Sequence, residues 1–451
     1  MEEIIALVPL LFVGVDWGSV NHRVIVLDQA GKQLHDWNVE HAGDAIASFI
    51  ERLVALVDGA AERCHVAIEV KHGPIVEALL ERGLIVFAVN PKQTDRFRDR
   101  YMPSGAKDDR RDAFVLARAL RTDADSLQRL SKTDRRTVVL RALIRLRDEL
   151  VTDRTRLLLR FREQVWRYYV QLIELADGDF DARWLWALWE KAPTPREGVL
   201  LSKPVIARIL RDHHVRRLDA PAVMAVLRKP AIAVADGVEE AAIKHVRSIV
   251  ERLRLLDSQI REANRELEEH LEMWSRMASG QGASNRSTKT TPAEGASSGR
   301  DEKPATSDDD PAVPRQDDLA ILRSLPGVGT ITLATMLAEL SEPLHQRDYP
   351  ALRAFFGVAP ITRQSGNSKV VQMRRACSES LRNIAFNWAR SAVQHDASCK
   401  ARFAALRARS KPPAQAYRAV VDHLLRVACS MLRSGALYDS ERRASQAALA
   451  A

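Results

Sequence analysis

Four carboxylates occupy positions at which a folded chain could gather them. Asp16 and Glu69 each end a short apolar run, whereas Asp109 and Asp112 open an apolar-periodic segment and share one face of a helix. Clustered carboxylates repel one another unless a cation lies between them, and an all-oxygen ligand set favours Mg²⁺ or Mn²⁺. Two such ions can activate a nucleophile and stabilise the leaving oxygen in an in-line displacement at phosphorus.

Other interpretations of these side chains stay open. Asp16 could simply cap a turn, and the nearby Asp95 and Asp99 are carboxylates without such a placement. Asp108 is four residues from Asp112, so helix geometry alone does not exclude it from the set.

The elements that must position these acids are predicted by periodicity. The run from Leu11 to Asp16 reads as a buried strand. The next two segments, Val24 to Leu27 and Gln33 to Asn38, complete a three-strand meander. Further on we expect, in order, a helix over Asp44 to Val57, a strand over His65 to Glu69, a helix over Pro74 to Arg82, a strand over Leu84 to Val89, a loop over Asp95 to Tyr101 and a helix from about Asp109. This alternation predicts a mixed α/β sheet.

Composition describes an ordinary soluble protein with a basic surplus. The 451 residues suggest two or three domains, with 46% hydrophobic and 28% charged residues. Lys and Arg number 68 against 59 Asp and Glu, a net charge of +9 that makes a polyanion such as nucleic acid a plausible partner. The four cysteines form no CxxC pair, which argues against a zinc ribbon or a disulfide framework and fits a reducing cytoplasm. The apolar N-terminal run lacks a basic n-region and is too short to span a bilayer, so we expect a cytoplasmic protein.

Residues 130–278 form a predicted helical region. One heptad seam contains Val139, Leu143, Leu146, Leu150 and Leu157, and another runs from Val246 to Trp274. They predict a coiled-coil pairing, within the chain or between chains, with the long helices of a monomeric bundle as the alternative. Between the seams, residues 177–236 predict short helices, and residues 279–318 are too poor in large apolar side chains to be anything but a flexible linker.

The C-terminal part, residues 319–440, has features that suit nucleic acid. The turn Pro326-Gly-Val-Gly329 between two helical patterns resembles a helix-hairpin-helix, in which Gly327 and Gly329 let the backbone approach a phosphate; the alternative is a tight turn only. Lys369 lies in a Gly-containing loop, and the helices predicted after it are dense in arginine, beginning with Arg374 and Arg375. Basic helices beside such a loop suit binding to a phosphate backbone.

Several motifs, taken in order, resemble DEDD-type transposases of bacterial insertion sequences, the family that includes the pilin-gene-inverting recombinases. The N-terminal motifs are Val13-Gly-Val-Asp16, Ala67-Ile-Glu69, Val89-Asn-Pro91 and Ala106-Lys-Asp-Asp109-Arg-Arg-Asp112-Ala113. The C-terminal motifs are Leu325-Pro-Gly-Val-Gly329, Phe356-Gly-Val-Ala-Pro360, Gln364-Ser365-Gly366 and Ser434-Gly-Ala-Leu-Tyr438.

The resemblance implies a fold and a mechanism. Residues 11–125 would form an α/β RNase H-like domain, similar to Holliday-junction resolvases. A largely α-helical coiled-coil insert and an α-helical C-terminal domain with the helix-hairpin-helix would follow. The family's acidic tetrad falls on Asp16, Glu69, Asp109 and Asp112, and its serine nucleophile on Ser365. Ser368 is the fallback. The family usually has Thr or Ser where this chain has Asp108, which leaves the choice between Asp108 and Asp109 open.

By the same resemblance the protein would be a transposase that cleaves and rejoins DNA through a covalent phosphoserine, with Mg²⁺ or Mn²⁺ as cofactor. Its partners would be double-stranded DNA at the element ends and the target, a structured guide RNA (a bridge RNA), and further copies of the chain in a dimer or tetramer. It would act in the bacterial cytoplasm at the nucleoid, with no membrane partner.

Three other functions are compatible with parts of this sequence. An actin-like sugar kinase would need a second, similar half with its own phosphate loop, and none follows. A catalytically silent DNA-binding protein is disfavoured because all five positions of the site are present. The serious alternative is a metal-dependent Holliday-junction-type endonuclease that hydrolyses DNA without a covalent intermediate, since the tetrad alone would suffice.

Overall fold

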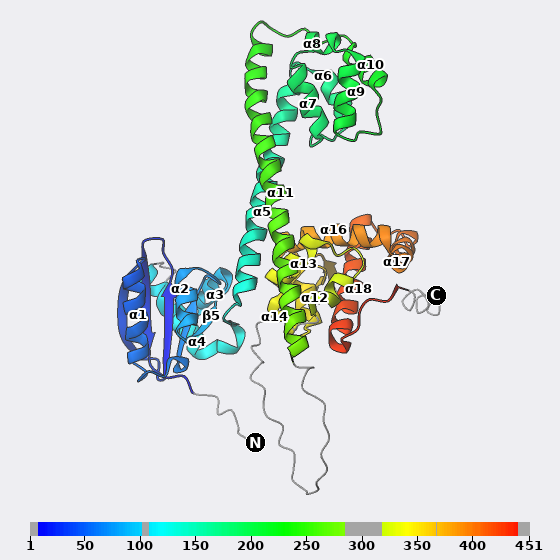
Figure 1. The fold of residues 1–451 in the computed structure, drawn as a ribbon. Coiled ribbons are helices and arrows are strands. Elements are labelled where there is room, and N and C mark those ends of the chain that lie inside the picture. Colours follow the sequence, from blue (N-terminus) through cyan, green and yellow to red (C-terminus); the bar gives the residue numbers. More distant parts are fainter. Residues whose placement is uncertain (1–7, 102–107, 285–317, 367, 441–451) are drawn as a thin grey trace. The chain divides into compact units, whose positions relative to one another are not determined.

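The computed structural model describes residues 8–101, 108–284, 318–366 and 368–440 (Figure 1). The chain divides into two compact units, the first up to Asp134 and the second from Arg135. The predicted helical region, apart from residues 130–134, and the predicted C-terminal part thus both belong to the second unit. Most of the predicted linker lies outside the described residues, although the helix before it continues to Ser284.

A six-stranded sheet forms the centre of the first unit, in the order β3-β2-β1-β4-β5-β6. The strands are β1 (Leu11–Asp16), β2 (Asn21–Leu27), β3 (Gln33–Glu40), β4 (Cys64–Ile68), β5 (Ile85–Ala88) and β6 (Gln128–Leu130). β1, β4 and β5 are parallel, and the other pairs are antiparallel. The predicted meander and the two later strands are confirmed, whereas β6, a three-residue strand, was not predicted.

Helices cover both faces of this sheet. They are α1 (Gly43–Ala55), α2 (Pro74–Glu81), α3 (Pro91–Tyr101) and α4 (Asp109–Asp123). α1 and α2 pack on the face that contains Val13, Val15 and Val66. α4 packs on the opposite face, against Phe12 and Ala67. The sheet is therefore buried on both sides, which is why its central strands read as continuous apolar runs.

The prediction of a loop over Asp95 to Tyr101 is wrong, because this segment belongs to α3. The Asn90 side chain accepts a hydrogen bond from the backbone amide of Lys92 at 2.9 Å, and Pro91 provides a favourable first helical residue. The inner face of the helix carries Thr94, fully buried, and Arg98 instead of a run of aliphatic side chains. Apolar periodicity was therefore too weak to reveal the helix.

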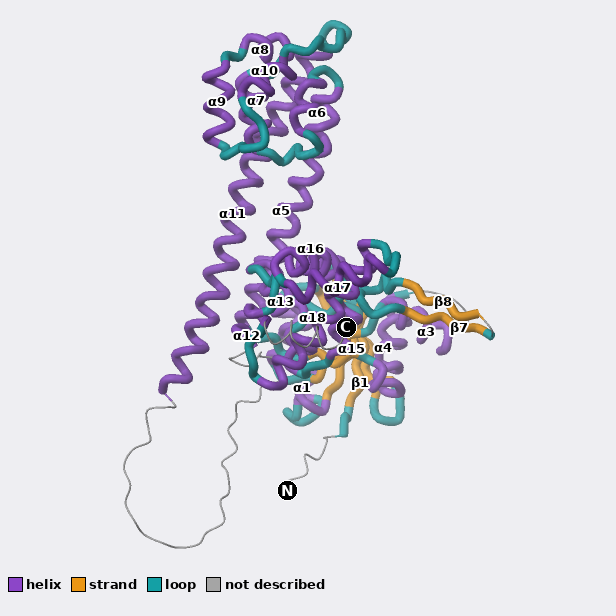
Figure 2. The backbone as a smooth tube through the Cα atoms, turned by 90° about the vertical axis from the view of Figure 1, so that its right-hand side faces the viewer, coloured by secondary structure: helices purple, strands orange, loops and turns teal. Residues whose placement is uncertain are grey.

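The second unit is built on a pair of antiparallel helices, α5 (Arg135–Trp166) and α11 (Val238–Ser284) (Figure 2). Arg147 donates to Asn264 at 2.9 Å, and the His270 ring contacts the carbonyl of Arg136 at 3.1 Å. The seam predicted on α11 is buried along its length.

The seam predicted on α5 is only partly confirmed. Val139 and Leu146 are exposed, so these two positions of the predicted seam are wrong. Leu157 is buried, and Leu143 and Leu150 are half-buried against the cores, so the other three positions are confirmed. Leu140 and Ile144, outside the predicted seam, are buried as well. The buried stripe of α5 therefore shares one heptad position with the predicted seam and differs from it at the other. Both stripes contain aliphatic residues at helical spacing, so the sequence alone did not distinguish them.

Short helices surround one end of the pair, as predicted. They are α6 (Val170–Ala176), α7 (Arg183–Lys191), α8 (Pro195–Leu200), α9 (Lys203–Asp212) and α10 (Ala220–Leu227). Their core contains Trp186, Tyr168 and Tyr169 together with the end of α5 and the beginning of α11.

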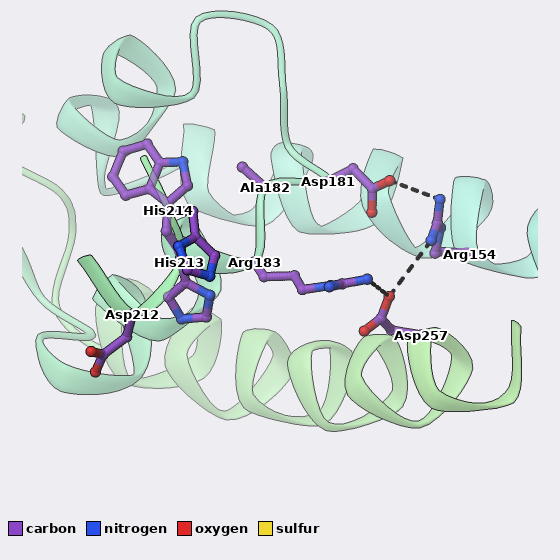
Figure 3. A pocket seen from close by; sticks show the side chains of 9 residues that line it. Arg154, Asp181, Ala182, Arg183, Asp212, His213, His214 and Asp257 are labelled. Atoms are coloured by element: carbon purple, nitrogen blue, oxygen red, sulfur yellow. Dashed lines mark hydrogen bonds and ion pairs between the residues drawn. The ribbon is translucent and has the colours of Figure 1, made fainter. Parts of the chain in front are cut away.

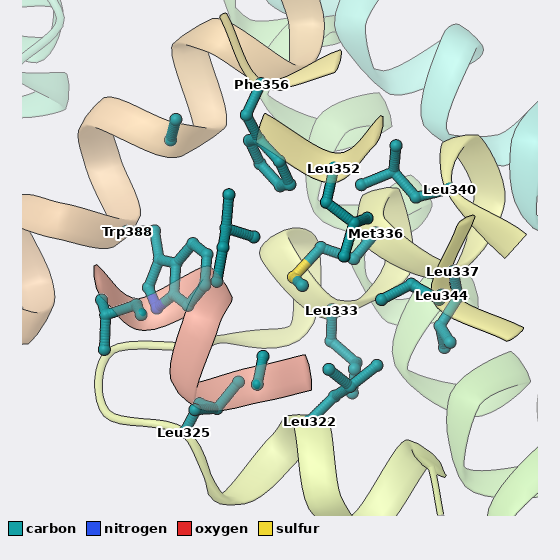
Figure 4. Close-up of a cluster of buried hydrophobic side chains, with 14 of the residues drawn as sticks. Leu322, Leu325, Leu333, Met336, Leu337, Leu340, Leu344, Leu352, Phe356 and Trp388 are labelled. Atoms are coloured by element: carbon teal, nitrogen blue, oxygen red, sulfur yellow. The ribbon is translucent and has the colours of Figure 1, made fainter. Parts of the chain in front are cut away.

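The opposite ends of α5 and α11 join a second core, made with the C-terminal elements. These are α12 (Asp318–Ser324), α13 (Thr330–Glu339), α14 (Ser341–His345), α15 (Tyr349–Phe355), β7 (Ile361–Ser365), β8 (Ser368–Gln372), α16 (Glu379–His395), α17 (Ala397–Ala408) and α18 (Pro413–Ser434). Leu322, Leu333, Met336, Phe356 and Trp388 meet in its interior (Figure 4). Within the part of the chain that the structure describes, no helix is both long and apolar enough to cross a membrane.

Candidate active site

Asp16 and Glu69 stand at the carboxyl ends of two neighbouring parallel strands. β1 and β4 pair with Val15 opposite Ile68, so the residue that follows each of these two is an acid, Asp16 on one strand and Glu69 on the other. Side chains alternate between the faces of a strand, and Phe12 faces α4. Asp16, four residues later, therefore lies on the face that α4 covers.

The other two acids reach this end of the sheet because α4 lies directly on β1. A Cβ atom added at Gly14 would lie 1.9 Å from the carbonyl oxygen of Ala113, a separation that only glycine permits. Further along α4, Arg121 donates to the carbonyl of Gln29 at 3.4 Å, and Gln29 in turn donates to Pro9, just before β1. α4 thus runs antiparallel to β1, which brings its first turn, with Asp109 and Asp112, toward the end that carries Asp16.

Asp108 and Asp109 have different surroundings. Asp108 is the N-cap of α4, and its Oδ1 accepts a hydrogen bond from the backbone amide of Arg111 at 2.8 Å. Its carboxylate also pairs with the Arg111 side chain at 3.2 Å. Asp109 is an exposed residue of the first helical turn. Capping gives Asp108 a structural role at the start of α4.

Asp112 is buried and paired with an arginine that the sequence did not single out. Nε and Nη2 of Arg98 contact its Oδ1 at 2.8 and 2.7 Å. Nη1 of Arg98 contacts Oδ1 of Asp95, also at 2.7 Å. Burial alone would lower the pKa of Arg98, but the hydrogen bonds to Asp112 and Asp95 outweigh it and raise that pKa.

The four acids come to one end of the sheet without closing into a ligand set. Among residues 8–101, 108–284, 318–366 and 368–440, no three His, Cys, Asp or Glu side chains are close enough to share a metal ion. Their donor chemistry still fits a hard cation, because every donor is a carboxylate oxygen. Mg²⁺ or Mn²⁺ would suit these acids.

Ser365 ends β7 at the tip of a two-stranded hairpin. The sequence predicted only a loop here, but Ile361–Ser365 and Ser368–Gln372 pair antiparallel, with Ser365 opposite Ser368. Both serines are exposed, and Gly366 has a φ of +53°, a conformation that favours glycine. The fallback serine is thus the direct neighbour of the favoured one.

Two predicted arginines lie outside the helices expected for them. Arg374 and Arg375 belong to the irregular segment between β8 and α16, at the base of the hairpin. Lys369, opposite Gln364, is exposed on the hairpin itself. These cations follow the hairpin instead of forming a helix face.

The turn between α12 and α13 gives its glycines different roles. Gly327 has a φ of +75°, and a Cβ added there would lie 2.5 Å from the amide nitrogen of Ala392 on α16. Packing against α16 thus requires glycine at this position. Gly329 is the N-cap of α13 and has open space around it, so its backbone is accessible to a ligand.

An aromatic side chain that was not predicted as a site residue lies among the arginines of α16. Arg382, Phe386 and Arg390 are spaced by four residues and therefore lie on one helix face. Phe386 is 47% exposed, and its ring lies 5.1 Å from that of Tyr417. Arginine periodicity could have drawn attention to Phe386, because cations flanking an exposed ring are typical of nucleic-acid surfaces.

A pocket of about 510 Å³ in the second unit contains none of the predicted site residues. Figure 3 shows Arg183 and Arg154 directed toward Asp257, with contacts of 2.8 and 3.9 Å. The other titratable groups that line the pocket include Asp181, whose pKa burial raises, and His213, whose pKa burial lowers. Its basic and acidic groups largely neutralise one another.

Two family models match this chain, one in its N-terminal part and one in its C-terminal part. The sequence model of DEDD-type IS110 transposases matches residues 13–170, and that of the transposase IS116/IS110/IS902 family matches residues 319–404. A putative transposase of Sinorhizobium fredii, y4uE, is 45% identical over 212 residues, which span 47% of this chain and 58% of that relative. The mini-circle putative transposase for IS117 of Streptomyces coelicolor is 26% identical over 442 residues, 96% of each chain. The chain belongs to the IS110 family of DEDD-type transposases.

Proposed function

We propose that this chain is the transposase of a mobile insertion sequence and that it cleaves and rejoins DNA strands through a covalent phosphoserine on Ser365. The observation that carries the proposal is the convergence of Asp16, Glu69, Asp109 and Asp112 at one end of the sheet. The strand order, with an antiparallel meander beside parallel β4 and β5, supports an RNase H-like fold for this unit.

The acids would bind Mg²⁺ or Mn²⁺, which when bound activates a nucleophile and neutralises charge on a phosphate. Ser365 presents its hydroxyl at an exposed hairpin tip, where a DNA strand can approach. Its Oγ would form a bond to phosphorus as the bond to the leaving sugar oxygen breaks, and the hydroxyl proton would pass to that oxygen through a base. Reversal with a new sugar hydroxyl would rejoin the strand and release the serine.

Cationic groups near this serine would bind the DNA backbone. Lys369, Arg374 and Arg375 lie on or beside the hairpin, and the accessible backbone at Gly329 begins α13. This last feature supports the helix-hairpin-helix assignment. The net charge of +9 supports binding of both DNA and a structured guide RNA.

Exposed apolar residues on the long helices support assembly of the chain into dimers or tetramers. Val138, Val139 and Leu146 on α5 are each more than one-third exposed. A second copy that covered this stripe would bury the part of the predicted seam that the single chain leaves in water. The proposed setting is the bacterial cytoplasm, at the nucleoid.

One observation favours a second candidate, a hydrolytic Holliday-junction-type endonuclease. All four acids belong to the first unit, whereas Ser365 belongs to the second. The first unit thus contains a complete acidic set without the serine. In that case water would attack the phosphate and no protein–DNA bond would form.

A denaturing gel separates the two functions. Purified full-length protein would be mixed with Mg²⁺, labelled element-end DNA, target DNA and RNA transcribed from the gene's flanks. We expect a labelled protein adduct that survives denaturation in the wild type and in Ser368→Ala and vanishes in Ser365→Ala. Cleaved ends without an adduct, equal in the wild type and Ser365→Ala, would establish hydrolysis. Loss of the adduct only in Ser368→Ala would move the nucleophile to that serine.

A further inference from the structure

The contact between Arg98 and Asp112 places a guanidinium on a carboxylate that the proposed function assigns to a divalent metal ion. We propose that Arg98 is the resident counter-cation of the acidic site: it neutralises Asp112 in the metal-free protein and competes there with the divalent ion. This inference rests on the proposed metal site and assigns a role to a residue outside the acidic tetrad. Arg98 is a positioning residue in this account, because it acts through Asp112.

The geometry holds Arg98 in place from two sides. Its guanidinium contacts Asp112 through Nε and Nη2 and contacts Asp95 through Nη1. The side chains of Arg98 and Asp112 are only 13% and 8% exposed, whereas that of Asp95 is 66% exposed. A buried carboxylate without a partner is costly, so the pair stabilises the metal-free fold of this region.

The same contact must weaken the binding of a metal ion. Both short contacts from Arg98 fall on Oδ1 of Asp112, and a guanidinium does not lose its proton in a protein. A divalent ion at that carboxylate would meet a fixed positive charge within a few ångströms, in a region with little water to screen it. Either the ion binds against this repulsion or the guanidinium leaves Asp112.

Asp95 provides a second acceptor for the Arg98 guanidinium when that guanidinium leaves Asp112. Its carboxylate is on the same helix, three residues earlier, and already binds Nη1. The transfer therefore requires a side-chain rotation and leaves helix α3 unchanged. An isolated arginine without this second acceptor would lose its only partner.

A neighbouring ion pair between the same two helices provides a matched control. Arg100 of α3 contacts Asp123 of α4 at 3.1 Å, and its side chain is 59% exposed. Asp123 lies at the other end of α4 from Asp112. Removing Arg100 thus deletes one positive charge and one contact between the helices without touching the acidic end of the sheet.

The test is Mn²⁺ titration calorimetry on the full-length protein without nucleic acid, together with thermal melting in EDTA. We expect Arg98→Gln to bind Mn²⁺ on the order of tenfold more tightly than the wild type while its metal-free melting temperature falls. Arg98→Lys keeps the charge and should bind Mn²⁺ as the wild type does. Arg100→Gln should change the affinity little. Unchanged or weaker Mn²⁺ binding by Arg98→Gln would overturn the proposal, because a purely structural ion pair has that effect.

A second pair of variants keeps the test decisive if Arg98→Gln fails to fold. Asp95→Asn removes the alternative acceptor and should weaken Mn²⁺ binding several-fold more than Asp99→Asn, which deletes an equal charge one turn further along the exposed side of α3. Equal effects of these two variants would contradict the competition.

The metal site and the role of Arg98 can fail separately. Mn²⁺ binding that is lost in Asp16→Asn but is the same in Arg98→Gln and the wild type would overturn only the role of Arg98. Absence of binding in the wild type and in a folded Arg98→Gln would overturn both the role of Arg98 and the metal-dependent function on which it rests.

Discussion

Asp108 and Asp109 are adjacent acids with different surroundings. Asp108 accepts the hydrogen bond that caps α4, whereas Asp109 is exposed in the first helical turn. We expect Asp108→Ala to lower the free energy of unfolding by about 1 kcal/mol and to retain DNA cleavage. Asp109→Ala should unfold as the wild type does and lose cleavage.

Urea denaturation and the gel assay, applied to both variants, check this assignment. A stable but inactive Asp108→Ala together with an active Asp109→Ala would make Asp108 the third acid. Each variant serves as the control for the other, because the two substitutions remove the same charge one residue apart.

A second prediction at the scale of a single residue concerns the close packing of α4 on Gly14. A methyl group there would meet the backbone of α4, which cannot rotate away as a side chain could. We expect Gly14→Ala to lower the free energy of unfolding by roughly 1–3 kcal/mol or more, measured by urea denaturation. The control is Gly43→Ala at the start of α1, where an added Cβ meets nothing within 4 Å. Equal stabilities of the two variants would show that α4 does not lie on β1.

The residues differ in how far the sequence could reveal them. The four acids could be predicted because strand ends and helix starts are visible in apolar periodicity. Arg98 could not, since it lies in a charged segment without an aliphatic stripe and its partner Asp112 is fourteen residues away. Ser365 was assigned through the family resemblance alone, because a Ser-Gly pair by itself is typical of any surface turn.

At the scale of elements, α16 presents one face that suits nucleic acid. Arg382 and Arg390 flank the exposed ring of Phe386. We expect Arg382→Gln and Arg390→Gln each to reduce by about one the slope of log affinity against log salt for DNA or RNA. Phe386→Ala should weaken single-stranded binding by about 1–3 kcal/mol with little change in slope.

Fluorescence anisotropy at several salt concentrations measures both effects. Arg208→Gln, an exposed arginine of α9 in the other core of the unit, is the control and should leave the slope unchanged. Slopes that fall equally in the control and in the α16 variants would mean that general charge, and not this helix face, governs binding.

The elements themselves were predicted unevenly. The stripe on α11 could be read directly because its aliphatic positions repeat over many turns and all of them are buried. α5 carries aliphatic residues on two stripes, and burial by α11 and the C-terminal core selects one of them. The β7–β8 hairpin escaped prediction because its strands are short and largely exposed, so they lack the alternation that marks a half-buried strand.

At the scale of the whole molecule, the hydrophobic core of the first unit is made entirely of its own residues. Both faces of its sheet are covered by its own helices, α1 and α2 on one side and α4 on the other. We expect a fragment of residues 8–134 to fold alone and to unfold cooperatively, because its core needs no residue of the second unit. Dispersed amide signals by NMR and a single urea transition would support this, whereas a broad transition with dye-binding apolar surface would contradict it.

The helix pair of the second unit also sets the distance between the two hydrophobic cores of that unit. One core surrounds Ile249 of α11, and the other surrounds Leu271. At 1.5 Å per residue these points are about 33 Å apart along the helix. A turn of B-form DNA measures about 34–36 Å. On a straight duplex parallel to α11, one surface carried by each core would therefore meet the DNA about one helical turn apart and on the same side.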